Sequence, residues 1–186
     1  TVYKRLAEVL DTLPNGFPST PEGFEIKLLK KIFKPEDAEL FCKLKLTFET
    51  AQQIAERTGL PPAGLEEQLA AMSEAGQIQG FQLGESKFYR MKPWMPGIYE
   101  LQLYKIDKEL AELWEDYFPV YNAQFYSSTP SSWQVLPIEK EIDVQHISIP
   151  YEKASALIER AQSFMVHECL CKKEKGLLGK PCEKPL

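Results

Sequence analysis

The segment TAQQIAERTGLPPAGLEEQLAAMSEAG, residues 50–76, has the pattern of two short helices joined by a tight turn. Its first part, T-A-x-x-I-A-x-x-T-G-L, is typical of the first helix of a helix-turn-helix, with the turn at Thr58-Gly59-Leu60. Pro62 then opens a second helix, in which apolar residues recur at spacings of four and three. Gly76 is expected to close this second helix.

The residues that follow predict a β-hairpin. Residues 77–83 alternate between apolar and polar side chains, residues 84–87 have turn chemistry, and residues 88–91 form the return strand. Helix, turn, helix and hairpin follow one another in this order in a winged helix. We therefore expect an α+β chain in which residues 1–95 form a winged helix-turn-helix domain.

Residues 96–186 are expected to add a long linking helix and a small strand–helix unit. Apolar residues between Ile98 and Phe118 repeat at intervals of four and three, which predicts one amphipathic helix. Its apolar face is expected to pack on the winged helix, with a partner or a second copy of the chain as the alternative. The remaining expected elements are strands over 132–142 and 147–149, a helix over 150–161 and a cysteine-rich tail.

The composition fits a globular protein of the reducing cytoplasm. Hydrophobic residues make up 44% of the chain, which is enough for a core, and the net charge is −5. No run of 18 apolar residues occurs, so no membrane span is expected. The first residues lack the shape of a signal peptide, and the four cysteines do not form a pattern typical of secreted disulfide proteins.

The strongest functional motif is Cys169-Leu-Cys171, followed after ten residues by Cys182. Thiolates are soft ligands that suit zinc or the iron of an iron–sulfur cluster. The two cysteines of the pair are expected on one short extended stretch, and the glycine-containing loop after them can fold back to present the third. Lys172 and Lys173 are expected to favour the thiolate form by lowering the pKa of the neighbouring thiols.

The fourth ligand is not given by this motif, although a cluster or a structural zinc usually has four. Cys42 lies inside a predicted helix and is expected to be a core residue. His167 lies two residues before Cys169 and offers an alternative zinc site, because residues i and i+2 of an extended segment share a face. Three free thiols in a flexible tail are the remaining interpretation.

Residues 149–161 and the tail CLCKKEKGLLGKPCEKPL, residues 169–186, resemble a family of ferredoxin-type 4Fe–4S proteins of anaerobic bacteria and archaea. In that family a winged-helix-like N-terminal region precedes a Cys-x-Cys-x10-Cys segment, and further cysteines follow. The resemblance covers most of the chain and implies that Cys169, Cys171 and Cys182 are cluster ligands. It also implies that the next ligand lies beyond Leu186, so the ligand set of this chain is expected to be incomplete.

A winged helix raises the question of DNA binding, which needs Lys and Arg for phosphates and side chains that reach base edges. The second helix of the helix-turn-helix has no Lys or Arg, and only Gln68 and Ser73 are candidates for a base contact. Lys87 and Arg90 of the hairpin add a thin basic patch. These residues favour a protein-docking role for the domain over DNA binding.

The sequence therefore favours the N-terminal part of an electron-transfer protein, in which the winged helix docks a redox partner protein and the cysteines hold a 4Fe–4S cluster. A glycine-rich phosphate loop, a nucleophile elbow and a paired-histidine motif are absent, so an electron carrier or redox subunit is favoured over a catalyst. Two alternatives stay open. One is a metal- or redox-responsive winged-helix regulator that binds DNA, and the other is a zinc-stabilised module that uses His167.

Overall fold

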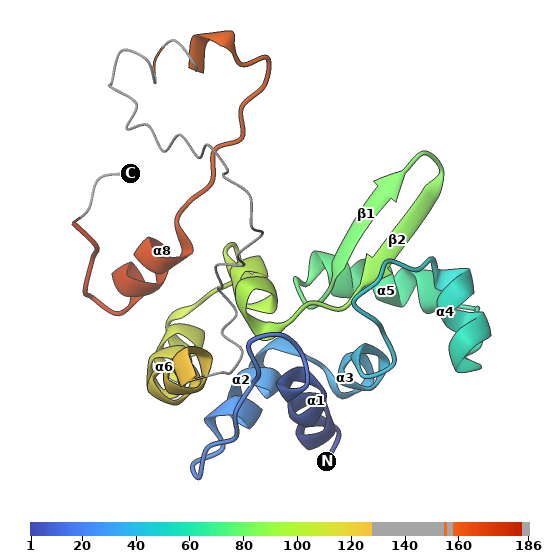
Figure 1. The fold of residues 1–186 in the computed structure, drawn as a ribbon, viewed down its shortest axis with the longest axis horizontal. Helices are drawn as coiled ribbons and strands as arrows, with labels where there is room; N and C mark the ends of the chain where they lie inside the picture. The colour runs from blue at the N-terminus through green and yellow to red at the C-terminus, as the bar shows by residue number, and fades with distance from the viewer. Residues whose placement is uncertain (128–154, 156–157, 184–186) are drawn as a thin grey trace, which may run out of the picture.

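The computed structural model describes residues 1–127, 155 and 158–183. Over these residues the fold is mostly helical α+β, with a two-stranded antiparallel hairpin. Helices α1 (Val2–Asp11), α2 (Phe24–Ile32) and α3 (Pro35–Phe41) lie in the middle, with α6 on one side and α4, α5 and the hairpin on the other (Figure 1). No helix in this part of the chain has both the length and the apolar character needed to cross a membrane.

Local side-chain chemistry explains where α2 and α3 begin. Thr20 precedes α2, and its hydroxyl accepts a hydrogen bond from the Phe24 N–H (2.8 Å). The buried Glu25 carboxylate in turn accepts from both the N–H and the hydroxyl of Thr20, at 3.0 and 2.7 Å, so polar groups at this buried helix start are paired. Pro35 occupies the first turn of α3, where a missing N–H costs nothing.

Helices α4 (Ala51–Thr58) and α5 (Leu65–Glu74) confirm the two helices expected from residues 50–76. Thr50 and Gln53 form a reciprocal capping box at the start of α4, in which each side chain accepts a hydrogen bond from the other residue's N–H, at 2.8 and 3.2 Å. Gly59 ends α4 with a φ of 71°, in the left-handed region that favours glycine. The turn therefore begins where the sequence places it, but the prediction that Pro62 opens the second helix is wrong: Gly64 has a left-handed φ of 78°, and α5 begins only at Leu65.

Strands β1 (Gln79–Leu83) and β2 (Ser86–Arg90) form the predicted hairpin around the two-residue turn Gly84-Glu85. Phe81 lies opposite Phe88 in the register. On its far side, β2 is bridged to the segment before α4, because Tyr89 and Glu49 exchange both backbone hydrogen bonds, at 2.8 and 3.0 Å. Helix α5 packs against β1 and α4 against β2, so the hairpin is held by both helices.

The long helix exists, but it begins and ends later than the sequence predicts. Helix α6 spans Lys108–Ser127, and two short turns, η1 (Trp94–Ile98) and η2 (Glu100–Gln102), occupy the first part of the expected helix. Asp107 sets the start of α6, because its Oδ1 accepts a hydrogen bond from the Leu110 N–H at 2.9 Å. The apolar spacing runs through both η2 and α6, which explains why one periodic pattern was interpreted as one helix.

A cluster of aromatic rings forms the part of the core that joins α6 to the first helices. Trp114 of α6 lies 4.4 Å from Tyr99 and 5.9 Å from Trp94, measured between ring centroids. Phe17, which follows α1, contacts both Trp94 (4.9 Å) and Tyr117 of α6 (5.2 Å). The core is therefore continuous across the boundary predicted between residues 95 and 96, and that domain division stays a prediction.

The last described helix is α8 (Leu170–Leu177), which packs on α6. The predicted extended conformation at Cys171 is wrong, because this residue lies in the first turn of α8; Cys169, just before it, is extended. The predicted strands over 132–142 and 147–149, and most of the predicted helix over 150–161, lie outside the described residues.

Replacing Trp114 with alanine tests the importance of the aromatic cluster. Trp114 is buried among five other rings, so Trp114→Ala is expected to lower the free energy of unfolding by about 3–5 kcal/mol. Tyr126→Ala on the same helix is the matched control, because Tyr126 is 77% exposed, and it should change stability by less than about 1 kcal/mol. Urea unfolding, followed by far-ultraviolet circular dichroism rather than by tryptophan fluorescence, measures the free energy of unfolding of both variants. Equal losses of stability in the two variants would contradict the assignment of the core.

Candidate metal centre at the start of helix α8

Cys169 and Cys171 lie together at the start of α8. Cys169 caps the helix in an extended conformation, and its carbonyl accepts a hydrogen bond from the Lys173 N–H at 3.0 Å. Cys171 lies in the first turn and is exposed, and it is near enough to Cys169 for the two sulfurs to interact electrostatically. The two sulfurs therefore share one side of the helix start and can bind one soft metal ion together.

The electrostatics at Cys171 differ from the prediction. Partial burial, the neighbouring Cys169 and the carboxylate of Glu174 raise the pKa of the Cys171 thiol. The lysines were expected to lower it, but Lys173 instead forms an ion pair with Glu168 (3.3 Å) and lies 5.7 Å from the centre of the Tyr104 ring. Binding of a metal cation would therefore have to displace the thiol proton of Cys171.

Helix α8 is held against the body of the protein by Glu174. This side chain is only 3% exposed, and its Oε2 accepts a hydrogen bond from the hydroxyl of Tyr99 at 2.8 Å. Lys175 adds an ion pair with Glu115 of α6 and lies 3.6 Å from Glu174 Oε1. One turn of α8 thus contacts both α6 and the segment between η1 and η2, and this anchors the helix that carries the cysteine pair.

Burial and proximity to Glu115 raise the pKa of Glu174, whereas the ammonium of Lys175 lowers the pKa of Glu115. Burial also raises the pKa of Tyr99, so its hydroxyl stays a hydrogen-bond donor. Sequence reasoning missed Glu174, because it stands between lysines in a segment that resembles a solvated tail. Its helical spacing from Leu170 and Leu177, three or four residues away on the same face, is the signal that pointed to burial.

The structure places the other predicted ligands apart from the pair. Cys182 and His167 are both exposed. Within the described residues, no three side chains of His, Cys, Asp or Glu lie close enough together to hold a metal ion. The described part of the chain therefore brings together two thiols, fewer than a 4Fe–4S cluster or a structural zinc needs, and it does not by itself fit either group.

Cys42 lies far from this pair in the sequence and has a different environment. It is half-buried at the end of α3 and packs against the hydrophobic core. Burial is the main reason that the pKa of its thiol is raised. This position suits the core role that the sequence predicts, and it makes Cys42 a useful control residue.

The three candidate DNA contacts all have partners within the chain. The side-chain amide of Gln68 donates to Asp37 Oδ1 at 3.2 Å, and Lys87 lies 3.9 Å from Glu66 Oε1. Arg90 donates to Gln79 Oε1 at 2.9 Å, and its guanidinium lies 4.3 Å from the centre of the Phe48 ring.

The nearby basic side chains are neutralised in the same way. Arg57 makes a two-pronged ion pair with Glu49, with contacts of 2.6 and 2.7 Å, and Lys45 lies 3.9 Å from the same carboxylate. The first turn of α5 carries Glu66 and Glu67, in the position where a DNA-reading helix has groups that approach base edges. A surface of balanced ion pairs with acidic groups on the exposed helix suits a protein partner better than a polyphosphate.

Comparison with protein-family models, with curated proteins and with solved structures gives no significant match for this chain.

Replacing Tyr99 with phenylalanine tests the anchoring of α8. The change removes the donor to the buried Glu174, which is expected to weaken docking of α8 by about 1–3 kcal/mol. Hydrogen exchange should therefore become faster for the amides of α8 but not for those of α1. Tyr104→Phe is the control, because Tyr104 is 69% exposed. Unchanged exchange in α8 of the Tyr99→Phe protein would show that Glu174 does not hold the helix.

Proposed function

We propose that this chain is the N-terminal part of an iron–sulfur electron-transfer protein of the 4Fe–4S ferredoxin type. Residues 1–95 act as a winged-helix domain that docks a protein partner, and α8 carries cluster ligands. The observation that carries the proposal is the pair of adjacent thiols, Cys169 and Cys171, at the start of a helix that is anchored to the core. Anchored ligands lose less conformational entropy on binding than ligands in a free tail.

In this proposal Cys169, Cys171 and Cys182 are ligands to iron. Cys169 and Cys171 are already neighbours, whereas Cys182 is exposed beyond the end of α8, where Gly179 has a φ of 70°. The remaining ligand comes from residues after Leu186, as the resemblance to ferredoxin-type proteins implies. The cluster supplies one-electron chemistry when bound, and the residues described here hold and orient its ligands.

The docking role follows from the surface of α4, α5 and the hairpin. Arg57 and Lys87 are paired with carboxylates of the same chain, so a phosphate backbone would have to compete with Glu49 and Glu66 for them. A hollow of about 290 Å³ between α3 and the start of α5 is lined by Glu36, Glu39 and Lys43 together with apolar side chains. Mixed charge around apolar contacts is typical of the rim of a protein–protein interface.

Iron analysis of the full-length protein tests the ligand assignment. After anaerobic reconstitution with iron and sulfide, the double variant Cys169→Ser/Cys171→Ser is expected to hold about four irons fewer per chain than the wild type, because one 4Fe–4S cluster loses two ligands. Cys182→Ser should give the same loss. Cys42→Ala is the matched control and should keep the wild-type iron content, since Cys42 packs against the core.

Two other outcomes would redirect the assignment. An unchanged iron content in the double variant would contradict the ligand role of the cysteine pair. One zinc per chain, lost in a His167→Ala variant, would instead indicate the zinc-stabilised module.

The order helix, turn, helix, hairpin keeps a second candidate function, a metal- or redox-responsive regulator that binds DNA. We expect the chain to bind duplex DNA at most with the affinity of nonspecific binding, which corresponds to a dissociation constant of about 10⁻⁴–10⁻⁶ M at physiological salt. Lys87→Ala/Arg90→Ala should leave this affinity unchanged, and Lys4→Ala/Lys27→Ala on the opposite part of the fold is the control. Binding that is much tighter, steeply salt-dependent and lost only in the hairpin variant would favour the regulator.

A further inference from the structure

Strand β1 has an edge that no described residue pairs with. Both backbone groups of Tyr89 bond Glu49, which means that they point away from β1. In an antiparallel ladder, the backbone N–H and C=O groups of two opposite residues either bond each other or all point away from the partner strand. Gly80 lies opposite Tyr89, so its N–H and C=O point outward, away from β2.

The same alternation applies two residues further on. Gln82 lies opposite Lys87, and its backbone groups also point outward. Within the described part of the chain, no hydrogen bond reaches the outward groups of Gly80 or Gln82, and the side chain of Gln82 bonds the Gly84 carbonyl (3.0 Å). The edge thus offers two donors and two acceptors, arranged around Phe81.

The face of the hairpin that points away from α5 is apolar and exposed. Phe81 is 42% exposed and Leu83 is 68% exposed. Phe81 lies between two rings, edge-on to Phe48 (4.6 Å) and stacked on Phe88 (5.3 Å). An exposed aromatic cluster beside an open strand edge is the kind of surface that associates with another chain.

The residues of β1 carry none of the devices that natural proteins use to protect an edge. Its sequence, QGFQL, has no charged residue and no proline, and the nearest charge along the chain is Glu85 in the turn. A groove of about 200 Å³ runs between α5 and the hairpin, and Gly80, Phe81 and Gln82 of β1 line it together with Glu74 of α5. A strand that approaches this edge therefore meets no charged side chain of β1 itself.

We propose that β1 pairs with β1 of a second copy of this chain, antiparallel and centred on Phe81. In this register Gly80 of each copy lies opposite Gln82 of the other, and the two pairs exchange four backbone hydrogen bonds. The two Phe81 side chains face each other in the position where antiparallel strands bring side chains closest. The pattern is self-complementary about a twofold axis, which favours a second copy over an unrelated extended peptide.

The contact is small, because each copy contributes one five-residue strand. Small interfaces give weak, concentration-dependent association, so the dimer should appear between about 10 µM and 1 mM protein, the usual range of weak transient contacts. The association joins two chains through the hairpin and leaves both cysteine pairs uncovered. It is therefore independent of the proposed cluster and extends the docking role to a second copy.

Sedimentation velocity over a concentration series tests the dimer. The wild-type chain should move from monomer towards dimer with increasing concentration. Phe81→Lys is expected to keep the protein monomeric, because it places two ammonium groups directly opposite each other. Phe88→Lys is the matched control, since it disturbs the same aromatic stack from the inner strand and should still dimerise. A wild-type chain that stays monomeric throughout would overturn the proposal.

Cross-linking checks the register without relying on a charged variant. In a chain with its four native cysteines changed to serine, Phe81→Cys should form a disulfide-linked dimer with copper(II) phenanthroline as the oxidant, because facing residues bring their Cβ atoms within disulfide range. Leu83→Cys is the more exposed position, at 68% against 42%, but the two copies of residue 83 lie at opposite ends of the paired strands, so it should cross-link at least tenfold more slowly. Equal rates at the two positions would overturn the proposed pairing.

Discussion

The burial of Trp94, Tyr99 and Trp114 in one aromatic cluster is the constraint on which the other parts of the structure depend. Trp94 and Tyr99 lie in the segment that connects the hairpin to α6, and Trp114 belongs to α6 itself. Phe17 brings the segment after α1 into the same cluster. The hydroxyl of Tyr117, one turn along α6, donates to the Pro18 carbonyl at 2.9 Å and fixes the register of α6 against that segment.

This cluster also connects to the candidate metal centre. Tyr99 packs its ring on Trp114 and donates its hydroxyl to Glu174 of α8, so one side chain joins the core to the cysteine-bearing helix. The arrangement has a cost, because the indole N–H of Trp94 is buried without a partner among the described residues. An unsatisfied buried donor costs about 1–3 kcal/mol, and the packing of the surrounding rings has to offset it.

The sequence predicts most of residues 50–91 well, because local chemistry and tertiary structure agree there. Gly59 ends α4, a second helix follows, and alternation marks the hairpin. The bounds of the helix over residues 98–118 are harder to predict, because the apolar spacing continues through η2 into α6 and only Asp107 marks the boundary between them. A capping residue in the middle of a periodic segment is a weak signal beside six apolar side chains spaced by four and three.

The candidate site was predicted only in part, for a related physical reason. The Cys-x-Cys pair is visible as a motif, but the helix that carries it has a polar, lysine-rich sequence with few apolar residues. It is held by tertiary contacts of charged residues, Glu174 with Tyr99 and Lys175 with Glu115, and only Leu170 and Leu177 mark its buried face in the sequence. The predicted effect of the lysines on the acidity of Cys171 is also wrong, because Lys173 forms an ion pair with Glu168, and burial raises the pKa of the Cys171 thiol.

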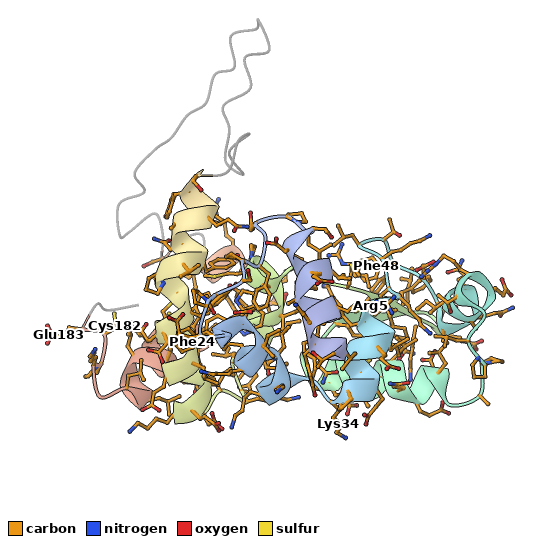
Figure 2. All side chains as sticks on the ribbon, turned by 90° about the horizontal axis from the view of Figure 1, so that it is seen from below. Arg5, Phe24, Lys34, Phe48, Cys182 and Glu183 are labelled. Atoms are coloured by element: carbon orange, nitrogen blue, oxygen red, sulfur yellow. The ribbon has the colours of Figure 1, made fainter. Side chains whose placement is uncertain are left out.

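The two proposed interaction sites lie at different ends of the described structure. Figure 2 labels Cys182 beyond α8 at one end and Phe48, beside the hairpin, toward the other. Helices α1, α2 and α3 lie between them (Figure 1). A chain that pairs or docks through its hairpin therefore leaves the cysteine-bearing helix accessible, and a ligand bound at α8 does not cover the strand edge. Tyr99 lies in the segment between the hairpin and α6 and also donates its hydroxyl to Glu174, so the aromatic cluster is the part of the core that contacts α8 directly.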